Sequence, residues 1–310
     1  MLRFTIILLF ILASFQSLKG QQNILYSQYM FDKMLLNPAY AGSSKWMVGS
    51  IKNRMQLVNL DGSPTTNLLT FQAPVQAKNI GFGVKIIHDK IAVTNSLTAT
   101  GIFTYHIGFG GGKLSFGLEG GIVNNSFNYD VLNRVDNIDP AIPIGKESVL
   151  LPEISTGVFF RTPSMYVGAS LYHLFNSQSK TSFLGNNDLY SLNRCFYGMG
   201  GYTFDVSKKF SLEPSFLTKY ARGAPFQLDL NLTAFLYNRF SVGTSFRTGD
   251  AVILLFKVDV TKNFKVFYSY DITLSNLAKY SSGSHEIGIS YGIELLPPPQ
   301  QKVMHPRYYF

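Results

Sequence analysis

In the sequence PFQLDLNLTAFLY, residues 225–237, apolar and polar side chains alternate one by one. One face would carry Phe226, Leu228, Leu230, Leu232 and Ala234, and the other would carry Gln227, Asp229, Asn231 and Thr233. A period of two is the spacing of a β-strand whose two faces meet different surroundings. The same period recurs in AVILLFKVDV (residues 251–260) and in HEIGISYGIEL (residues 285–295). These runs predict a chain built from amphipathic β-strands.

About fourteen such runs follow residue 43, separated by Gly, Asn, Asp, Pro and Ser. They begin near residues 44, 65, 80, 94, 113, 153, 164, 195, 209, 225, 239, 251, 263 and 284. Most span about nine to thirteen residues, which suits strands that cross a bilayer at about 45°. The sequence therefore predicts an all-β fold, namely a transmembrane antiparallel β-barrel of about 14 strands.

The connections between the runs differ in length. Tight turns are expected at residues 108–113, 207–209, 237–239 and 261–263, and long connections at residues 127–151 and 174–194. The long loops of membrane barrels face outward. We therefore expect the long connections at the cell surface and the tight turns in the periplasm.

The distribution of charge distinguishes a membrane barrel from a soluble one. Charged residues make up 15% of the chain, and aromatic residues also reach 15%, whereas a typical soluble protein has about 25% charged residues. One set of strand faces collects both signs of charge, as expected of a hydrated lumen: Lys85, Lys113, Glu119, Arg161, Glu213, Asp229, Arg247, Lys257, Lys265, Asp271, Glu286 and Glu294. Aromatic girdles at the membrane interfaces are expected from Phe103, Tyr105, Tyr166, Tyr172, Tyr202, Tyr268 and Tyr270.

The beginning of the chain has the layout of a signal peptide, with Arg3 ahead of an apolar run at residues 4–15. That run is too short to cross a bilayer of about 30 Å as a helix. We divide the chain into a signal peptide (residues 1–20), an N-terminal plug or docking segment (21–43), an outer-membrane β-barrel (44–296) and a C-terminal tail (297–310). The sequence predicts export to the outer membrane.

Composition argues against several classes of function. The net charge is +9 and falls to +7 when Arg3 and Lys19 leave with the leader, and the basic residues are spread along the chain. This pattern does not indicate a nucleic-acid groove. The single cysteine, Cys195, excludes an internal disulfide framework and a multi-cysteine zinc site. We expect no cofactor and no metal.

Apparent catalytic motifs lack the context that they require. GISYG, at residues 288–292, matches the pattern of serine hydrolases, but Ser290 would lie in mid-strand with no helix to follow. The five histidines are isolated, and the neighbours His285 and Glu286 would point to opposite faces of a strand. An outer-membrane hydrolase that uses HDK, at residues 88–90, is a weaker alternative. The chain is expected not to be an enzyme.

The segment YSQYMFDKMLLNPAYAGS, residues 26–43, has neither helical nor strand periodicity. Tyrosines, amides and the helix-breaking Pro38 suit docking against a preformed surface. We expect it to act as a plug or docking segment, with contacts from Tyr29, Asn37 and Tyr40. The alternative is that it merely covers the periplasmic mouth of the barrel.

Several motifs resemble the PorP/SprF family of outer-membrane proteins, which is associated with the type IX secretion system of Bacteroidota. They are SQYMFDKMLLNPAYAGS at the start, NRMQLVNLDGSPTT around Arg54 and Gln56, LSFGLEGG, LEPSFLTKY, VGTSFR, YSYDIT and GSHEIGISY, in this order. Departures at Leu57, Phe267 and His305 mark the chain as a divergent paralogue. The resemblance covers almost the whole chain.

The resemblance implies a non-enzymatic barrel that assists secretion or surface attachment of a partner such as an adhesin, through the partner's C-terminal domain. Periplasmic or lipoprotein components of the secretion system are further implied partners, beside membrane lipid. The alternative is a passive outer-membrane channel or hydrophobic-solute transporter. The candidate partner-binding residues are Tyr26, Gln28, Tyr29, Asn37, Pro38, Tyr40, Arg54, Gln56, Arg247, Asp271, His285 and Glu286.

Overall fold

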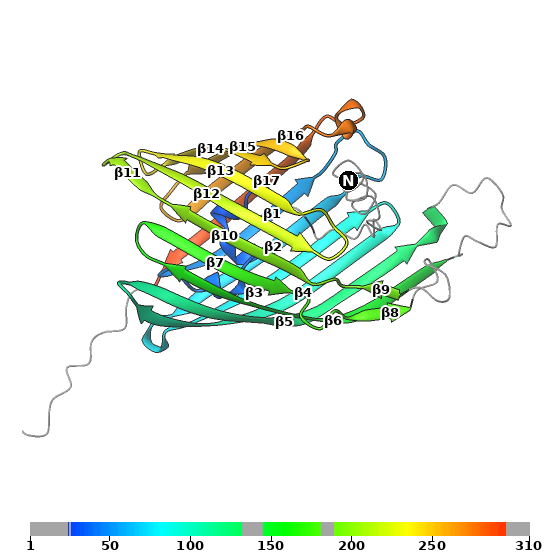
Figure 1. Ribbon diagram of the computed structural model, residues 1–310, viewed down its shortest axis with the longest axis horizontal. Helices are drawn as coiled ribbons and strands as arrows, with labels where there is room; N and C mark the ends of the chain where they lie inside the picture. The colour runs from blue at the N-terminus through cyan, green and yellow to red at the C-terminus, as the bar shows by residue number, and fades with distance from the viewer. Residues whose placement is uncertain (1–23, 25, 132–144, 181–188, 296–310) are drawn as a thin grey trace, which may run out of the picture.

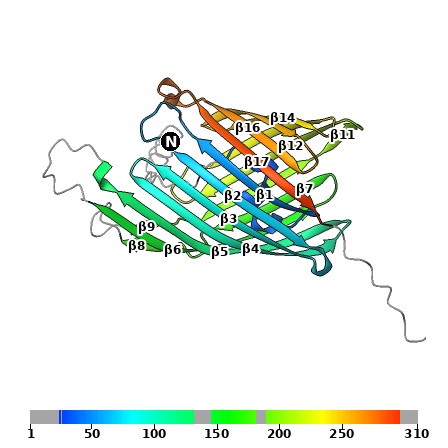
Figure 2. The ribbon, with the colours of Figure 1, turned by 180° about the vertical axis from the view of Figure 1, so that it is seen from behind.

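The computed structural model describes residues 24, 26–131, 145–180 and 189–295. Its strands form one closed antiparallel ring of 14 strands, because β10 pairs with β12 as well as with β7 (Figures 1 and 2). The ring comprises β1 (Trp46–Met55), β2 (Thr65–Val75), β3 (Ile80–Ile91), β4 (Thr94–Phe109), β5 (Gly112–Asn128), β6 (Lys146–Arg161), β7 (Met165–Tyr172), β10 (Cys195–Tyr202), β12 (Phe210–Ala221), β13 (Gln227–Leu236), β14 (Phe240–Arg247), β15 (Ala251–Asp259), β16 (Phe264–Thr273) and β17 (Ser284–Glu294). The predicted barrel is confirmed.

Three short strands lie outside this count. β11 (Phe204–Ser207) extends the line of β10 and pairs with β12, while β8 (Gln178–Lys180) and β9 (Leu189–Ser191) form a separate hairpin. Two 3-10 turns, η4 (Gln76–Lys78) and η5 (Tyr129–Val131), follow strands, and η7 (Asn276–Lys279) lies between β16 and β17. No helix among the described residues is both long and apolar enough to cross a membrane.

The two ends of the barrel differ. At one end, called the long-loop end, β5 connects to β6 and β7 connects to β10. At the other, the tight-turn end, short turns join β4 to β5 and β13 to β14. β1 begins and β17 ends at this same end. The long connections and the tight turns therefore lie at opposite ends of the barrel.

The alternation in residues 227–236 appears as expected. Leu230 is 51% exposed on the outer face, whereas the neighbouring Asp229 is completely buried in the lumen. In the register of β13 and β14, Asp229 lies directly opposite Arg247, which also points inward. Apolar side chains thus cover the outside of the ring, and charged side chains are enclosed within it.

The expected boundary of β6 was wrong. The strand begins at Lys146 rather than near residue 153, so the preceding connection is shorter than expected. Pro152 lies within this strand, opposite Ile122. No strand is paired with its other edge at that position, because β7 pairs with β6 only from Thr156 onward. A proline on such an edge removes no ladder hydrogen bond.

The faces of two aromatic residues differ from expectation, and so does the character of the lumen. Phe103, Tyr105, Tyr202 and Tyr268 are exposed on the outer face, but Tyr166 and Tyr172 point into the lumen. Ile253 and Leu255, on β15, are inward and fully buried. They belong to an apolar cluster that includes Tyr26, Tyr29, Met30 and Leu35 of the N-terminal segment. The lumen is therefore packed in part with apolar side chains rather than uniformly hydrated.

Candidate functional site in the barrel lumen

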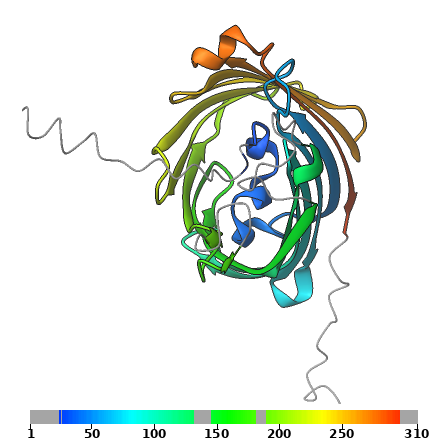
Figure 3. The ribbon, with the colours of Figure 1, turned by 90° about the vertical axis from the view of Figure 1, so that its right-hand side faces the viewer.

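Residues 26–43, called the lumenal segment, lie inside the ring of strands, where Figure 3 shows them as the dark blue coil. The segment consists of three 3-10 turns, η1 (Tyr29–Phe31), η2 (Lys33–Leu35) and η3 (Pro38–Tyr40). Pro38 occupies the first position of η3, where its missing N–H is tolerated. Most of its side chains are buried against the wall. The absence of a regular period in its sequence matches this succession of short turns.

The segment enters the lumen at the long-loop end through a charged cluster. Arg54 donates from Nη2 to Asp271 Oδ2 at 2.7 Å, and from Nη1 to Glu286 Oε2 at 3.2 Å. Ser27 donates its backbone N–H to Glu286 Oε2 and its hydroxyl to Asp271 Oδ2, both at 2.8 Å. Arg54, Asp271 and Glu286 come from β1, β16 and β17 and are almost completely buried. Three strands therefore converge on one residue of the segment.

A second arginine holds the adjacent residue. Arg247, on β14, donates from Nη2 to the carbonyl oxygen of Tyr26 at 2.9 Å. Its Nε donates to both carboxylate oxygens of Asp229, at 3.1 and 3.2 Å, and Asp250 lies 3.4 Å from Nη1. A buried guanidinium needs such partners, because an unpaired buried charge is strongly destabilising. Asp229 thus fixes the arginine that holds the segment.

The middle of the segment is bound by polar side chains from opposite walls. The hydroxyl of Tyr29 shares hydrogen bonds with the amide of Asn231, with separations of 2.8 and 3.1 Å. On the other wall, Asp32 Oδ2 lies 3.4 Å from Lys52 Nζ and accepts a hydrogen bond from Thr70 at 3.1 Å. Gln28 adds a hydrogen bond to the carbonyl oxygen of Glu286 at 2.6 Å. The segment therefore bridges the lumen.

Toward the tight-turn end the segment packs closely on β5, β6 and β7. Asn37 Nδ2 donates to the carbonyl oxygens of Val158 and Ala169 at 3.0 and 3.3 Å, while its Oδ1 accepts from the N–H of Ala39 at 2.9 Å. Thr104, on β4, donates to the carbonyl oxygen of Pro38 at 2.9 Å. One amide side chain thus both caps η3 and joins two strands of the wall.

Inward-facing glycines make this approach possible. Gly117 and Gly157 face each other in the β5–β6 register. A Cβ atom at Gly117 would lie 2.2 Å from Ala39 N, and one at Gly157 would lie 2.2 Å from Asn37 Oδ1. No side chain fits at such distances, so glycine is required where the segment meets the wall.

Burial controls the protonation of the segment's own groups. Burial raises the pKa of the Tyr29 hydroxyl well above its usual value, and the negative charge of Asp229 adds to the effect. Burial also lowers the pKa of Lys33, although the carboxylate of Glu213, 3.9 Å away, acts in the opposite direction. Tyr29 thus remains a neutral hydrogen-bonding anchor at neutral pH.

The structure brings together most of the residues that the sequence singled out. Those in or facing the lumen are Tyr26, Gln28, Tyr29, Asn37, Pro38, Tyr40, Arg54, Arg247, Asp271 and Glu286. Gln56 lies just beyond the end of β1. His285 is on the opposite face of β17 from Glu286, as the alternation predicted, and its Nδ1 lies 2.8 Å from the hydroxyl of Tyr268. Neither Gln56 nor His285 joins the lumenal cluster.

Several contact residues were missed by the sequence reasoning. Lys52, Asn231 and the wall glycines contact the lumenal segment, and Ser27, within the segment, contacts the wall. The sequence did hold one indication of the wall contacts. Gly117 and Gly157 fall on the inward faces of consecutive strands, and small residues on an enclosed face leave room for another segment to approach. Ser27 carried no comparable signal.

The arrangement is suited to holding a segment rather than to bond chemistry. Ser290 lies in mid-strand on β17, as the sequence predicted, so the GISYG match has no strand-to-helix turn. It is paired with Ser50 of β1. In the described ranges, no group of three His, Cys, Asp or Glu residues is placed to hold a metal ion. The buried charged side chains around Arg54 and Arg247 are instead engaged in contacts with the segment and with one another.

The closed antiparallel ring with an apolar outer face and enclosed charges defines an outer-membrane β-barrel. Residues 18–291 match the family model described as type IX secretion system membrane protein PorP/SprF, and the chain belongs to this family. Family and fold together support an outer-membrane location.

Among solved structures, the CymD monoaromatic hydrocarbon channel is similar with a TM-score of 0.53 and 14% identity, over 91% of this chain and 97% of that chain. The TodX deltaS2S3 mutant channel gives a TM-score of 0.49 at 10% identity, over 90% and 98%. Omp33 of Acinetobacter baumannii gives 0.45 at 8% identity, over 81% and 97%. At such identities CymD supports the fold alone. No curated protein matches the chain.

Proposed function

We propose that this protein is a non-enzymatic barrel of the type IX secretion system that assists the secretion or surface attachment of a partner protein, such as an adhesin. Membership of the PorP/SprF family supports the link to secretion. The partner would be recognised through its C-terminal domain, and periplasmic or lipoprotein components of the system are further candidate partners.

The observation that carries the proposal is the occupation of the lumen. The lumenal segment is tied to β14, β16 and β17 near one mouth and to β4, β6 and β7 near the other. An open channel needs a continuous path, whereas a filled barrel offers a fixed surface on which a partner can dock. The segment therefore favours attachment over passive transport.

The proposed orientation places the long-loop end at the cell surface and the tight turns in the periplasm. Its support is that long loops of membrane barrels face outward. In this orientation the charged cluster around Arg54 and Arg247 lies beneath the surface loops. A partner that docks on those loops would rest on a mouth that the lumenal segment braces from within.

The test replaces Tyr29, Asn37 and Tyr40 together by Ala in cells that carry the full secretion system. We expect the barrel to remain heat-modifiable and membrane-inserted, while surface retention of the partner adhesin is lost. Tyr237→Ala, at an exposed tight turn, is the matched control and should leave display unchanged. Normal adhesin display by the triple variant would refute a docking role for the segment.

Conductance separates the attachment proposal from the channel alternative. Purified wild-type protein should show little conductance in planar bilayers, because the lumenal segment fills the barrel. The triple variant should conduct more if the wall contacts hold the segment in place. A large, steady conductance of the wild-type protein, without any adhesin bound to it in membrane extracts, would favour the passive channel.

A further inference from the structure

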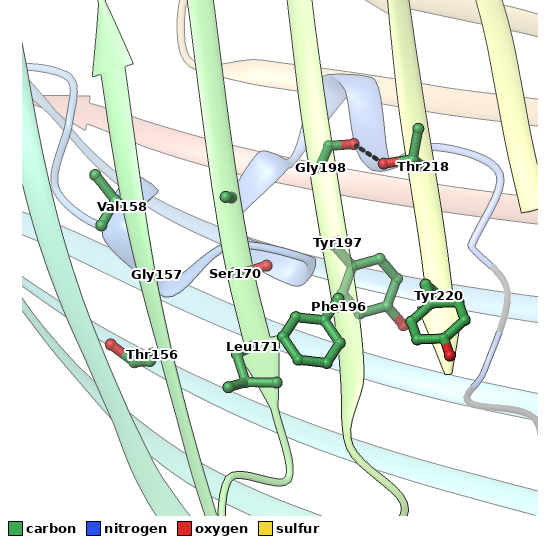
Figure 4. Close-up of a pocket in the computed structure, with 11 residues that line it drawn as sticks. Thr156, Gly157, Val158, Ser170, Leu171, Phe196, Tyr197, Gly198, Thr218 and Tyr220 are labelled. Carbon is green, nitrogen blue, oxygen red and sulfur yellow. Dashed lines mark hydrogen bonds between the residues drawn. The ribbon is translucent and has the colours of Figure 1, made fainter. Parts of the chain in front are cut away.

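The outer wall carries an apolar groove of about 390 Å³ where β6, β7, β10 and β12 lie side by side (Figure 4). Ala169, Gly198 and Thr218 form its shallow floor, and Leu171, Phe196 and Tyr220 rise beside it. All six belong to the outward faces of their strands. The hydroxyl of Thr218 donates to the carbonyl oxygen of Gly198 at 3.3 Å, which leaves the floor largely without free polar groups. The groove therefore suits a hydrocarbon chain.

Strand register places this groove in the half of the wall nearest the long-loop end. Phe196 lies opposite Tyr220, with ring centroids 6.4 Å apart, and the next pair toward the loops is Cys195 with Ala221. That pair forms the last step of the β10–β12 ladder. The aromatic pair thus sits one step below the rim, and the small-residue floor extends from it toward the middle of the wall.

Two arginines stand at the rim above the same two strands. Arg194 directly precedes Cys195 and Arg222 directly follows Ala221, and both side chains are exposed. Arg194 donates from Nε to the carbonyl oxygen of Leu174 at 2.9 Å, which anchors this exposed side chain at the rim. Within the described part of the chain, neither arginine forms an ion pair with a carboxylate.

We propose that this wall is a binding site for a phosphorylated acyl lipid, and that its occupant is lipid A of the outer leaflet. Arginine binds phosphate oxygens through paired, charge-assisted hydrogen bonds. The groove below would take one acyl chain, which would be held there by close van der Waals packing, because inside a bilayer no hydrophobic driving force acts between apolar surfaces. The assignment to the outer leaflet rests on the proposed orientation and is independent of any role in adhesin attachment.

The test measures lipid binding to the full-length mature barrel in detergent micelles by native mass spectrometry. The three probes are bis-phosphorylated lipid A, the same lipid after removal of its phosphates, and phosphatidylglycerol. We expect bis-phosphorylated lipid A to bind best. Arg194→Gln together with Arg222→Gln should weaken that binding by about tenfold or more, as expected for lost charge-assisted hydrogen bonds.

A second variant tests the groove without altering charge. Ala169→Phe should fill the floor and weaken binding of lipid A, whereas Ala99→Phe, on the outer face of β4 in another part of the wall, should not. Lys90→Gln together with Lys279→Gln removes exposed charges at the same end of the barrel and is the control for the arginine pair. Heat-modifiable migration of every variant confirms that the barrel has folded.

Three outcomes would overturn the proposal. Equal binding of the phosphate-free lipid would show that the arginines do not select the headgroup. Equal binding of phosphatidylglycerol would remove the assignment to lipid A. Wild-type affinity in folded Arg194→Gln/Arg222→Gln or Ala169→Phe protein would show that lipid associates elsewhere on the wall.

Discussion

Arg247 donates a hydrogen bond of 2.9 Å to the carbonyl oxygen of Tyr26, 221 positions earlier in the chain. The same guanidinium is paired with Asp229 on the neighbouring strand. One side chain therefore joins two strands of the wall to the first residues of the lumenal segment. Its removal would affect both the wall and the segment.

Replacing Arg247 by Met should destabilise the barrel by about 3–5 kcal/mol, because Asp229 would stay buried without its counter-charge. The midpoint of urea unfolding in lipid vesicles measures this loss. Arg247→Met combined with Asp229→Leu removes both charges and should recover much of the stability. A double variant no more stable than Arg247→Met would show that the isolated carboxylate is not the cause.

Gly157→Ala should release the lumenal segment, because the new methyl group would lie 2.2 Å from Asn37 Oδ1. Forced overpacking of this kind typically costs about 1–3 kcal/mol. Hydrogen exchange of residues 36–40 should become faster while the strand amides stay protected. Gly101→Ala is the matched control, since a Cβ there meets nothing within 4 Å. Unchanged exchange in Gly157→Ala would contradict the tight contact.

Leu232→Arg should impair folding into lipid bilayers by about 2–4 kcal/mol, because residue 232 faces outward near the middle of β13. Leu228→Arg lies on the same face near the long-loop rim, where the cost falls to about 0–1 kcal/mol. Folding efficiency in vesicles, read from heat-modifiable migration, compares the two variants. Equal penalties would mean that depth in the membrane does not follow the strand axis.

A cysteine at position 175 should react with a membrane-impermeant maleimide on intact cells. Phe175 is 64% exposed in the connection from β7 to β10, at the end assigned to the cell surface. Lys208→Cys, in an exposed tight turn, should react only after the outer membrane is permeabilised. The native Cys195 is buried and should give no background. The reverse labelling pattern would invert the orientation.

The sequence was sufficient for the ring because each strand meets lipid on one side and a polar or packed interior on the other. That contrast imposes a period of two, which is why β3, β4 and β15 begin where the alternation predicted. Proline usually interrupts a strand, so Pro152 hides the true start of β6 in the sequence. It is tolerated there because no strand is paired with that edge of β6. Local sequence does not reveal that edge.

The contents of the lumen were harder to predict, because alternation assigns a face but not what lies opposite it. Tyr172 was expected in an interfacial girdle, yet its hydroxyl donates to the carbonyl oxygen of Leu35 at 3.1 Å. Ile253 and Leu255 are inward because apolar residues of the lumenal segment pack with them. The aromatic and amide side chains of residues 26–43 indicated docking. Which strands they contact could not be predicted, because that depends on how the ring closes around the segment.

The path of the lumenal segment has a consequence for the order of assembly. The segment runs from the cluster around Arg54 to the opposite mouth, and only then does the chain enter β1, whose pairing with β17 joins the first and last strands of the ring. Once that seam is hydrogen-bonded, the segment could enter only by threading end-on through a packed interior. If the sheet instead curls around residues 26–43 while the seam is open, no threading is needed. Residues 26–43 would then serve as the template on which the last strand of the barrel closes.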